Sequence, residues 1–232
     1  NIRVTDEIVT ALNERRIAIA FEPVVDIATR QPAFHECLVR MRQGDGSLLL
    51  APDIVPVAER LGLIRLIDHR VLELAVAELA AAPDARLSFN ISPDTLLDPD
   101  WLAGFDSLMR THPGAGERLI VEVTETVAIR DGEGVGGVIA RLKDFGCRIA
   151  LDDFGAGYTS FRNLRRLGFD ILKIDGGFVQ GLAQSPDDRA FVQTLIELAR
   201  RLRIVTVAEW VQDEESAAML AAWGCDYMQG RL

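Results

Sequence analysis

Short apolar runs alternate along the chain with longer segments in which apolar residues recur every three or four positions. Short runs rich in Val, Ile and Leu are typical of buried strands, whereas the longer period is typical of helices that bury one face. Strands are predicted at Ala18–Pro23, Phe34–Arg40, Leu87–Ile91, Leu119–Val123, Arg148–Leu151, Ile171–Ile174, Ile204–Ala208 and Asp226–Met228. Helices are predicted at Pro52–Leu61, Leu66–Ala82, Asp100–Arg110, Gly136–Phe145, Ser160–Leu167, Asp187–Leu202 and Asp213–Trp223.

The order of these elements predicts the fold class. From Leu87 onward strands and helices alternate, which implies right-handed crossovers and a parallel sheet. The first two strands are joined only by Asp26–Pro32, which is too short for a crossover helix, so they should be antiparallel. The 232 residues, 49% of them hydrophobic, come close to the ~250 typical of a TIM barrel. We therefore predict an α/β fold, a modified (β/α)8 TIM-type barrel with the first strand antiparallel to the second.

The chain shows no internal linker rich in Pro, Gly or Ser, so residues 1–232 are predicted to form one domain. We also expect this domain to be cut from a longer protein. The Gly-rich segment Gly132–Gly137 could cradle a phosphate, but no strand leads directly into it and no Lys-Ser/Thr follows. A flexible loop that enters a helix is the favoured interpretation. The most apolar helical stretch, Val71–Ala82, is too short to span a bilayer, so no membrane contact by this domain is expected.

The charge and the cysteines limit the class of partner and the compartment. The formal net charge is −10, from 25 basic and 35 acidic residues, which argues against binding a nucleic-acid polymer. An anionic substrate stays possible, because bound metal ions can reverse the local sign of charge. Cys37, Cys147 and Cys225 form no CxxC pair and are interpreted as reduced core thiols. We therefore expect a cytoplasmic domain, whose parent protein could be tethered to a membrane.

Acidic and amide side chains lie at or near the ends of most predicted strands. They are Glu22, Glu36, Asn90, Glu122, Glu125, Asp152, Asp153, Asp175 and Glu209. The carboxyl ends of parallel barrel strands meet at one mouth, and like charges packed there repel unless cations lie among them. Oxygen ligands select hard ions such as Mg²⁺, Mn²⁺ or Ca²⁺ over Zn²⁺. The pattern therefore predicts a divalent-metal site suited to cutting a phosphodiester.

The adjacent pair Asp152-Asp153 is the sharpest local feature. Neighbours within a strand point to opposite faces, but at a strand end the chain can turn so that both carboxylates reach one centre. Such a pair could hold two ions ~3.5–4 Å apart, which clamp the attacking and leaving oxygens of a phosphoryl transfer. Lys173 could orient the metal-held water or stabilise phosphoryl charge. A plain turn with an Asp cap and a plain surface lysine are the alternatives.

Several ordered motifs together resemble those of the EAL-domain cyclic di-GMP phosphodiesterases, and the resemblance covers nearly the whole chain. The motifs are Phe21–Asp26, Glu36–Arg40, Asn90–Ser92, Glu122–Glu125, Asp152–Tyr158, Lys173–Asp175, Ala208-Glu209 and Gln229-Gly230. The resemblance implies a barrel with one strand reversed. It also implies hydrolysis of cyclic di-GMP to linear pGpG with Mg²⁺ or Mn²⁺ in a two-metal site.

The resemblance also assigns roles to residues. The implied metal ligands are Glu36, Asn90, Glu122, Asp152, Asp153 and Glu209. The implied catalytic residues are Lys173 near the attacking water, Glu209, Asp152, Asp153, and Glu125 as a brace for the loop after the Asp pair. The implied substrate-binding residues are Glu22, Leu38, Arg40, Asp175 and Gln229. Family members often dimerise and often bind Ca²⁺ as an inhibitor, so a homodimer and inhibition by Ca²⁺ are expected.

The chain departs from the family pattern near the predicted site. Cys37 replaces the Ala of the name motif, and Glu22 stands where Gln is usual. After Glu209 the family usually reads Gly-Val-Glu, whereas this chain has Trp210 and then, two residues later, Gln212. Every matched metal ligand and the lysine are present, which favours an active enzyme. A module that binds cyclic di-GMP without cutting it, or a scaffold that has lost both activities, stays open.

Overall fold

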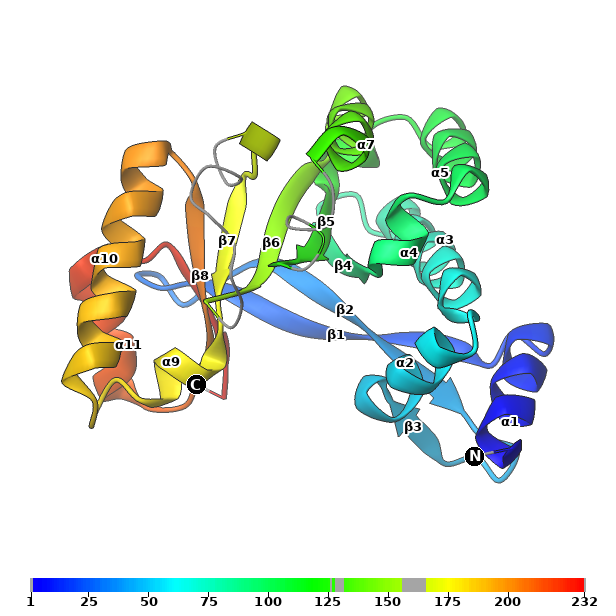
Figure 1. Ribbon diagram of the computed structural model, residues 1–232, viewed down its shortest axis with the longest axis horizontal. Coiled ribbons are helices and arrows are strands. Elements are labelled where there is room, and N and C mark those ends of the chain that lie inside the picture. Colours follow the sequence, from blue (N-terminus) through cyan, green and yellow to red (C-terminus); the bar gives the residue numbers. More distant parts are fainter. Residues whose placement is uncertain (1, 126, 128–131, 156–165, 232) are drawn as a thin grey trace.

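The computed structural model describes residues 2–125, 127, 132–155 and 166–231. The strands in this part of the chain are β1 (Ile17–Asp26), β2 (Pro32–Arg42), β3 (Leu48–Leu50), β4 (Leu87–Ile91), β5 (Leu119–Thr124), β6 (Arg148–Phe154), β7 (Ile171–Ile174), β8 (Val205–Val211) and β9 (Tyr227–Gly230). The helices are α1 (Ile2–Asn13), α2 (Ala51–Arg60), α3 (Ile64–Ala81), α4 (Pro93–Leu96), α5 (Pro99–Thr111), η1 (Gly116–Arg118), α7 (Gly132–Asp144), α9 (Gly176–Gln180), α10 (Pro186–Leu202) and α11 (Glu214–Trp223). Figure 1 shows their arrangement.

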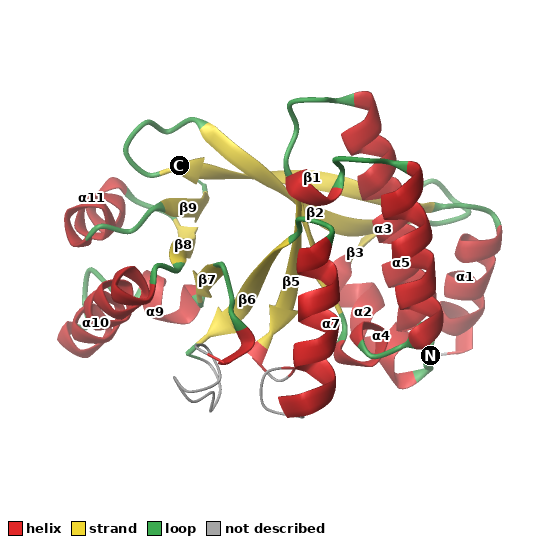
Figure 2. Cartoon of the chain, turned by 90° about the horizontal axis from the view of Figure 1, so that it is seen from above, coloured by secondary structure: helices red, strands yellow, loops and turns green. Residues whose placement is uncertain are grey.

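The strands close into a barrel. The sheet runs in the order β1-β9-β8-β7-β6-β5-β4-β2-β3, and the pairing of β1 with β2 closes it. From β2 through β4 to β9 the successive barrel strands are parallel, whereas β1 is antiparallel to both of its neighbours. Figure 2 shows the strands around the centre and the long helices outside them. The predicted barrel with a reversed first strand is confirmed, because the short link after Asp26 permits only a hairpin.

The packing follows from the apolar pattern. The first five residues of β5 are all buried, as expected for a parallel strand covered on both faces. Helix α3 turns Ile67, Val71 and Leu79 into the core and stops next to Pro83, which cannot continue a helix. The three cysteines are buried and free, and burial raises the pKa of the Cys37 thiol to about 12. No helix in the described part of the chain combines the length and apolarity that a membrane span requires.

The structure corrects several predicted elements. Helix α1, strand β3 and the short helices α4 and α9 were not predicted. β3, α4 and α9 are too short to show a period, whereas α1 spans 12 residues and is amphipathic, so its pattern was present in the sequence and was missed. The loop predicted at Gly132–Gly137 is wrong, since α7 already begins at Gly132. Burial of Val135, Ile139 and Leu142 outweighs the low helix propensity of glycine there. Of the helix predicted at Ser160–Leu167, residues 160–165 lie outside the described residues.

Candidate active site

Lys173 lies inside the barrel, with only 1% of its surface exposed, and four carboxylates surround it. Its Nζ lies 2.7 Å from Glu122 Oε2, 2.8 Å from Glu209 Oε1, and 3.1 Å from both Glu36 Oε2 and Asp152 Oδ1. These acids come from β2, β5, β6 and β8, so closure of the barrel brings them together around β7. A plain surface position for Lys173 is therefore excluded.

The charges of this cluster do not balance. Burial, followed by repulsion from Glu36, raises the pKa of Glu122 to about 8, and burial raises the pKa of Glu209 to about 7. Burial would also raise the pKa of Glu36, but Lys173 together with two amide donors outweighs it and lowers that pKa. Burial opposes the charge of Lys173, yet the four carboxylates raise its pKa well above the ordinary value. One ammonium thus faces four acids in a site shielded from water, which favours additional cations.

Glu36 is the best anchored of the acids. The Asn90 amide donates to its Oε1 at 2.7 Å, and the Gln229 amide donates to its Oε2 at 2.8 Å. In the antiparallel register of β1 and β2, Glu22 stands directly opposite Glu36. Like charges at opposed positions destabilise a sheet, so this pairing also favours a cation nearby.

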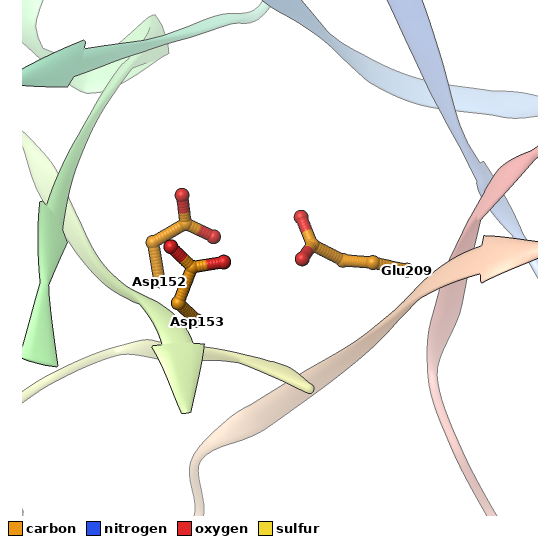
Figure 3. A group of neighbouring side chains, drawn as sticks. All are labelled: Asp152, Asp153 and Glu209. Carbon is orange, nitrogen blue, oxygen red and sulfur yellow. The ribbon is translucent and has the colours of Figure 1, made fainter. Parts of the chain in front are cut away.

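Backbone geometry aims the Asp pair. Asp153 has φ +55°, and the register between β6 and β7 shifts between Leu151 and Phe154. This irregularity interrupts the alternation of side chains, so buried Asp152 and exposed Asp153 both face Glu209 across the barrel mouth (Figure 3). One ligand oxygen from each of these three acids lies within 4.8 Å of the other two. The geometry that the sequence predicted for the Asp pair is therefore present.

Strand β8 uses a similar device. Its register with β9 shifts between Ala208 and Val211, and Trp210 has φ +56°. Glu209, just before this point, keeps its carboxylate among the other acids, whereas the Trp210 side chain is 60% exposed. The left-handed conformation is one that glycine adopts without strain and a bulky residue rarely adopts. The bulk of Trp210 was evident from the sequence, but its backbone conformation was not.

Two cavities meet at the acids. The first, of about 660 Å³, extends between β2, α2 and α3. The second, of about 460 Å³, lies over Lys173 and Glu209. Leu38, Asp152 and Asp153 line both, so the Asp pair marks the junction.

Among the residues that line these cavities, sequence reasoning did not single out Asp68 and Arg231. Asp68 is buried beside the first cavity and accepts the Ser92 backbone N–H at 3.0 Å. Burial raises the pKa of Asp68 to about 6. Arg231 lines the second cavity. The predicted elements offered no signal for Asp68, because it lies within the predicted helix Leu66–Ala82, far along the chain from the acidic motifs.

The predicted substrate-binding residues fall into two groups. Glu22, Leu38, Arg40 and Gln229 line the second cavity. Asp175 instead caps α9 by accepting the Gly177 N–H at 2.9 Å, and it is not among the described residues that line either cavity. Glu125 is buried just beyond β5, and the loop that it is predicted to brace extends into residues 156–165, outside the described residues.

The donor set fits hard divalent cations. The ligand atoms available are carboxylate and amide oxygens, which Mg²⁺ and Mn²⁺ prefer. Two buried oxygens, Glu122 Oε1 and Gln229 Oε1, have no hydrogen-bond partner among the described residues. A buried oxygen left without a donor is unfavourable, and a cation would satisfy it. Three acids lie close enough to one another to share an ion, namely Asp152, Asp153 and Glu209. Glu36 and Glu122 instead contact Lys173.

The family model described as "EAL domain" matches residues 5–232. The chain is 33% identical over 227 residues to the cyclic di-GMP phosphodiesterase PdeF of Escherichia coli K12. The matched region covers 96% of this chain and 30% of that relative. The chain thus spans about a third of the length of the curated relatives that it matches first.

Solved structures agree in fold. The structure of the PaMucR phosphodiesterase in complex with c-di-GMP superposes with a TM-score of 0.91 at 30% identity, covering 98% of this chain and 94% of that chain. The FimX EAL domain from Pseudomonas aeruginosa, bound to c-di-GMP, has a TM-score of 0.90 at 24% identity, covering 98% of this chain and 93% of that chain. At that lower identity the second likeness speaks for the fold alone.

Proposed function

The chain belongs to the EAL domain family, and on that premise we propose that it hydrolyses cyclic di-GMP to linear pGpG with the help of two divalent metal ions, Mg²⁺ or Mn²⁺. One observation carries the proposal: acids from four strands gather around a buried lysine where two cavities meet. A phosphodiester at this junction would lie against the acids, and a cyclic dinucleotide could extend into both cavities.

The residues proposed to hold the metal ions are Glu36, Asn90, Glu122, Asp152, Asp153 and Glu209. When bound, such ions supply a water of lowered pKa and neutralise the charge on the phosphodiester. Asn90 and Gln229 orient the Glu36 carboxylate by donating to its two oxygens. Lys173 keeps its proton, because its four acidic neighbours raise its pKa, so it acts as a fixed positive charge that positions the acids and stabilises developing phosphoryl charge.

The second cavity supplies groups for the rest of the substrate. Arg40 lines it and can pair with a phosphate or with the guanine edge, since guanidinium groups match such acceptors in a bidentate way. Leu38 offers an apolar contact at the junction of the cavities. Glu22 places an additional acid near an anionic ligand, which should weaken binding unless a cation lies between them.

A receptor that binds cyclic di-GMP without cleaving it is the second candidate function. It is favoured by Glu22, Trp210 and Gln212, which all line the second cavity and all depart from the family pattern. Tight binding that needs no metal, without product, would support it. In either case we propose a homodimer and a place as one cytoplasmic domain of a longer protein. For the enzyme we also propose inhibition by Ca²⁺ in place of the activating ion.

The test is turnover with the metal varied. Purified domain is incubated with cyclic di-GMP and Mg²⁺, Mn²⁺ or no metal, and pGpG is measured by chromatography. We expect product with one or both metals and none after chelation. The variants Glu36→Ala and Lys173→Ala should abolish turnover, whereas Lys143→Ala, on the outer surface, serves as the matched control. Absence of product with both metals, under conditions where ligand binds, would reject the enzyme in favour of the receptor.

A further inference from the structure

Trp210 is an unusual lining residue. Of the large hydrophobic side chains in the described part of the chain, it is the most exposed, at 60%. Isolated apolar residues on a protein surface are common and need no explanation. This one, however, lines the second cavity together with Arg40, Lys173 and Glu209. A large aromatic face is therefore presented beside the acids at the site.

Two structural features hold the indole in this place. The backbone of Trp210 has φ +56°, a conformation that is a genuine outlier for a bulky residue and that tends to occur at functional sites. The ring lies against Gly176 in α9, where a Cβ would come within 2.5 Å of Trp210 Cγ and Cδ1. The absence of a side chain at Gly176 is thus what allows the indole to pack directly onto the α9 backbone.

We propose that Trp210 stacks on one base of the cyclic dinucleotide in the second cavity. The proposal rests on the proposed function, because it takes cyclic di-GMP as the ligand. Stacking on an indole needs only the π-face of a base, and a ring already held in place loses little freedom on binding. It also provides attraction that does not depend on charge, in a cavity where Glu22, Glu36 and Glu209 repel an anionic ligand.

The position of Trp210 makes it a determinant of affinity rather than of chemistry. Its side chain lines the cavity and is 60% exposed, whereas the neighbouring Glu209 side chain contacts Lys173. Every nucleobase has a π-face, so stacking strengthens binding without selecting the base. In this chain, stacking on Trp210 could offset the loss of affinity that the acid at Glu22 causes.

The first experiment compares Trp210→Gly with Trp210→Phe. Glycine suits the left-handed backbone, so the variant is expected to fold, and phenylalanine keeps an aromatic face. Affinity for cyclic di-GMP is measured by calorimetry with Ca²⁺ present to suppress turnover. We expect Trp210→Gly to weaken binding by about 10-fold, the order expected for one lost base–aromatic stack, and Trp210→Phe by about 3-fold or less.

The second experiment uses Gly176 as an indirect probe. Gly176→Ala inserts a methyl group where the indole lies, so it should displace the ring and weaken binding in the wild-type background. In the Trp210→Gly background the same change should have little further effect, because there is no ring to displace. In a Trp223→Phe background, a change in indole emission on adding ligand should report mainly on Trp210, because Trp101 is buried and is not among the described residues that line the second cavity.

The outcomes separate the two proposals. Equal affinity of wild type and Trp210→Gly, with indole emission unchanged by ligand, would overturn stacking and leave the phosphodiesterase proposal intact. A changed oligomeric state of Trp210→Gly in size-exclusion chromatography, with affinity unaltered, would also overturn it, because the indole would then serve an interface. A wild-type domain that neither binds nor cleaves cyclic di-GMP would remove the proposed function and stacking with it.

Discussion

Replacing Lys173 by methionine in metal-free protein tests the electrostatic basis of the site. Methionine keeps most of the length and the apolar stem of lysine, so packing inside the barrel should change little. The ammonium is lost, and the four acids around it lose their shared positive neighbour.

The expected magnitude follows from the contacts. At an effective dielectric constant of 20, the shortest pair, at 2.7 Å from Glu122 Oε2, corresponds to a gross attraction of about 6 kcal/mol. Desolvation of the ammonium offsets much of this gain, whereas its removal leaves buried charges unpaired. We therefore expect Lys173→Met to lower the free energy of unfolding by about 3–5 kcal/mol.

The assay is urea unfolding in the presence of a chelator at about pH 9, where Glu122, with its pKa raised to about 8, is ionised. Lys143→Met is the matched control, since Lys143 pairs with Asp170 at 2.9 Å where both side chains are about one-third exposed. A pair of that kind contributes roughly 0–1 kcal/mol. Glu122→Gln removes one of the repelling charges. The double variant with Lys173→Met and Glu122→Gln should therefore lose less free energy of unfolding than the sum of the losses in the two single variants.

Two results would refute this reasoning. A loss below about 1 kcal/mol for Lys173→Met, similar to the surface control, would mean that the ammonium does not hold the acids together. Strict additivity of Lys173→Met and Glu122→Gln would mean that these two groups do not interact, contrary to their ion pair.

Two further predictions concern stability. Trp210→Gly should raise the free energy of unfolding by about 0.5–1 kcal/mol in urea titrations, because it relieves a left-handed conformation of a bulky residue. The lost side chain is largely exposed, so little packing is removed. A decrease in the free energy of unfolding would show that packing of the indole on Gly176 dominates. Asp68 has its pKa raised by burial from 3.8 to about 6, so its contribution to stability is present below about pH 4 and is lost as the pH rises through 6. Between pH 4 and 7 the free energy of unfolding of the wild type should therefore fall by about 2–3 kcal/mol relative to that of Asp68→Asn. Denaturant unfolding measures both, and parallel pH profiles of the two proteins would contradict this prediction.

The amino-acid sequence was sufficient for the architecture and for the chemical character of the site. Alternating apolar periods predicted the barrel strands and most long helices, because these patterns reflect local burial. The short link after Asp26 predicted the reversed first strand, since chain length alone forbids a crossover there. The oxygen ligands in the motifs predicted a site for hard cations, because ligand type follows directly from residue type.

Only the tertiary structure decided how these groups meet. Glu36 and Glu209 are far apart in the sequence, and closure of the barrel places both against Lys173. The left-handed backbones at Asp153 and Trp210 arise where strand registers shift, a property of strand pairs that a single-residue pattern does not contain. Local propensity describes neighbours along the chain, whereas charge balance, cavities and strain depend on contacts between distant segments.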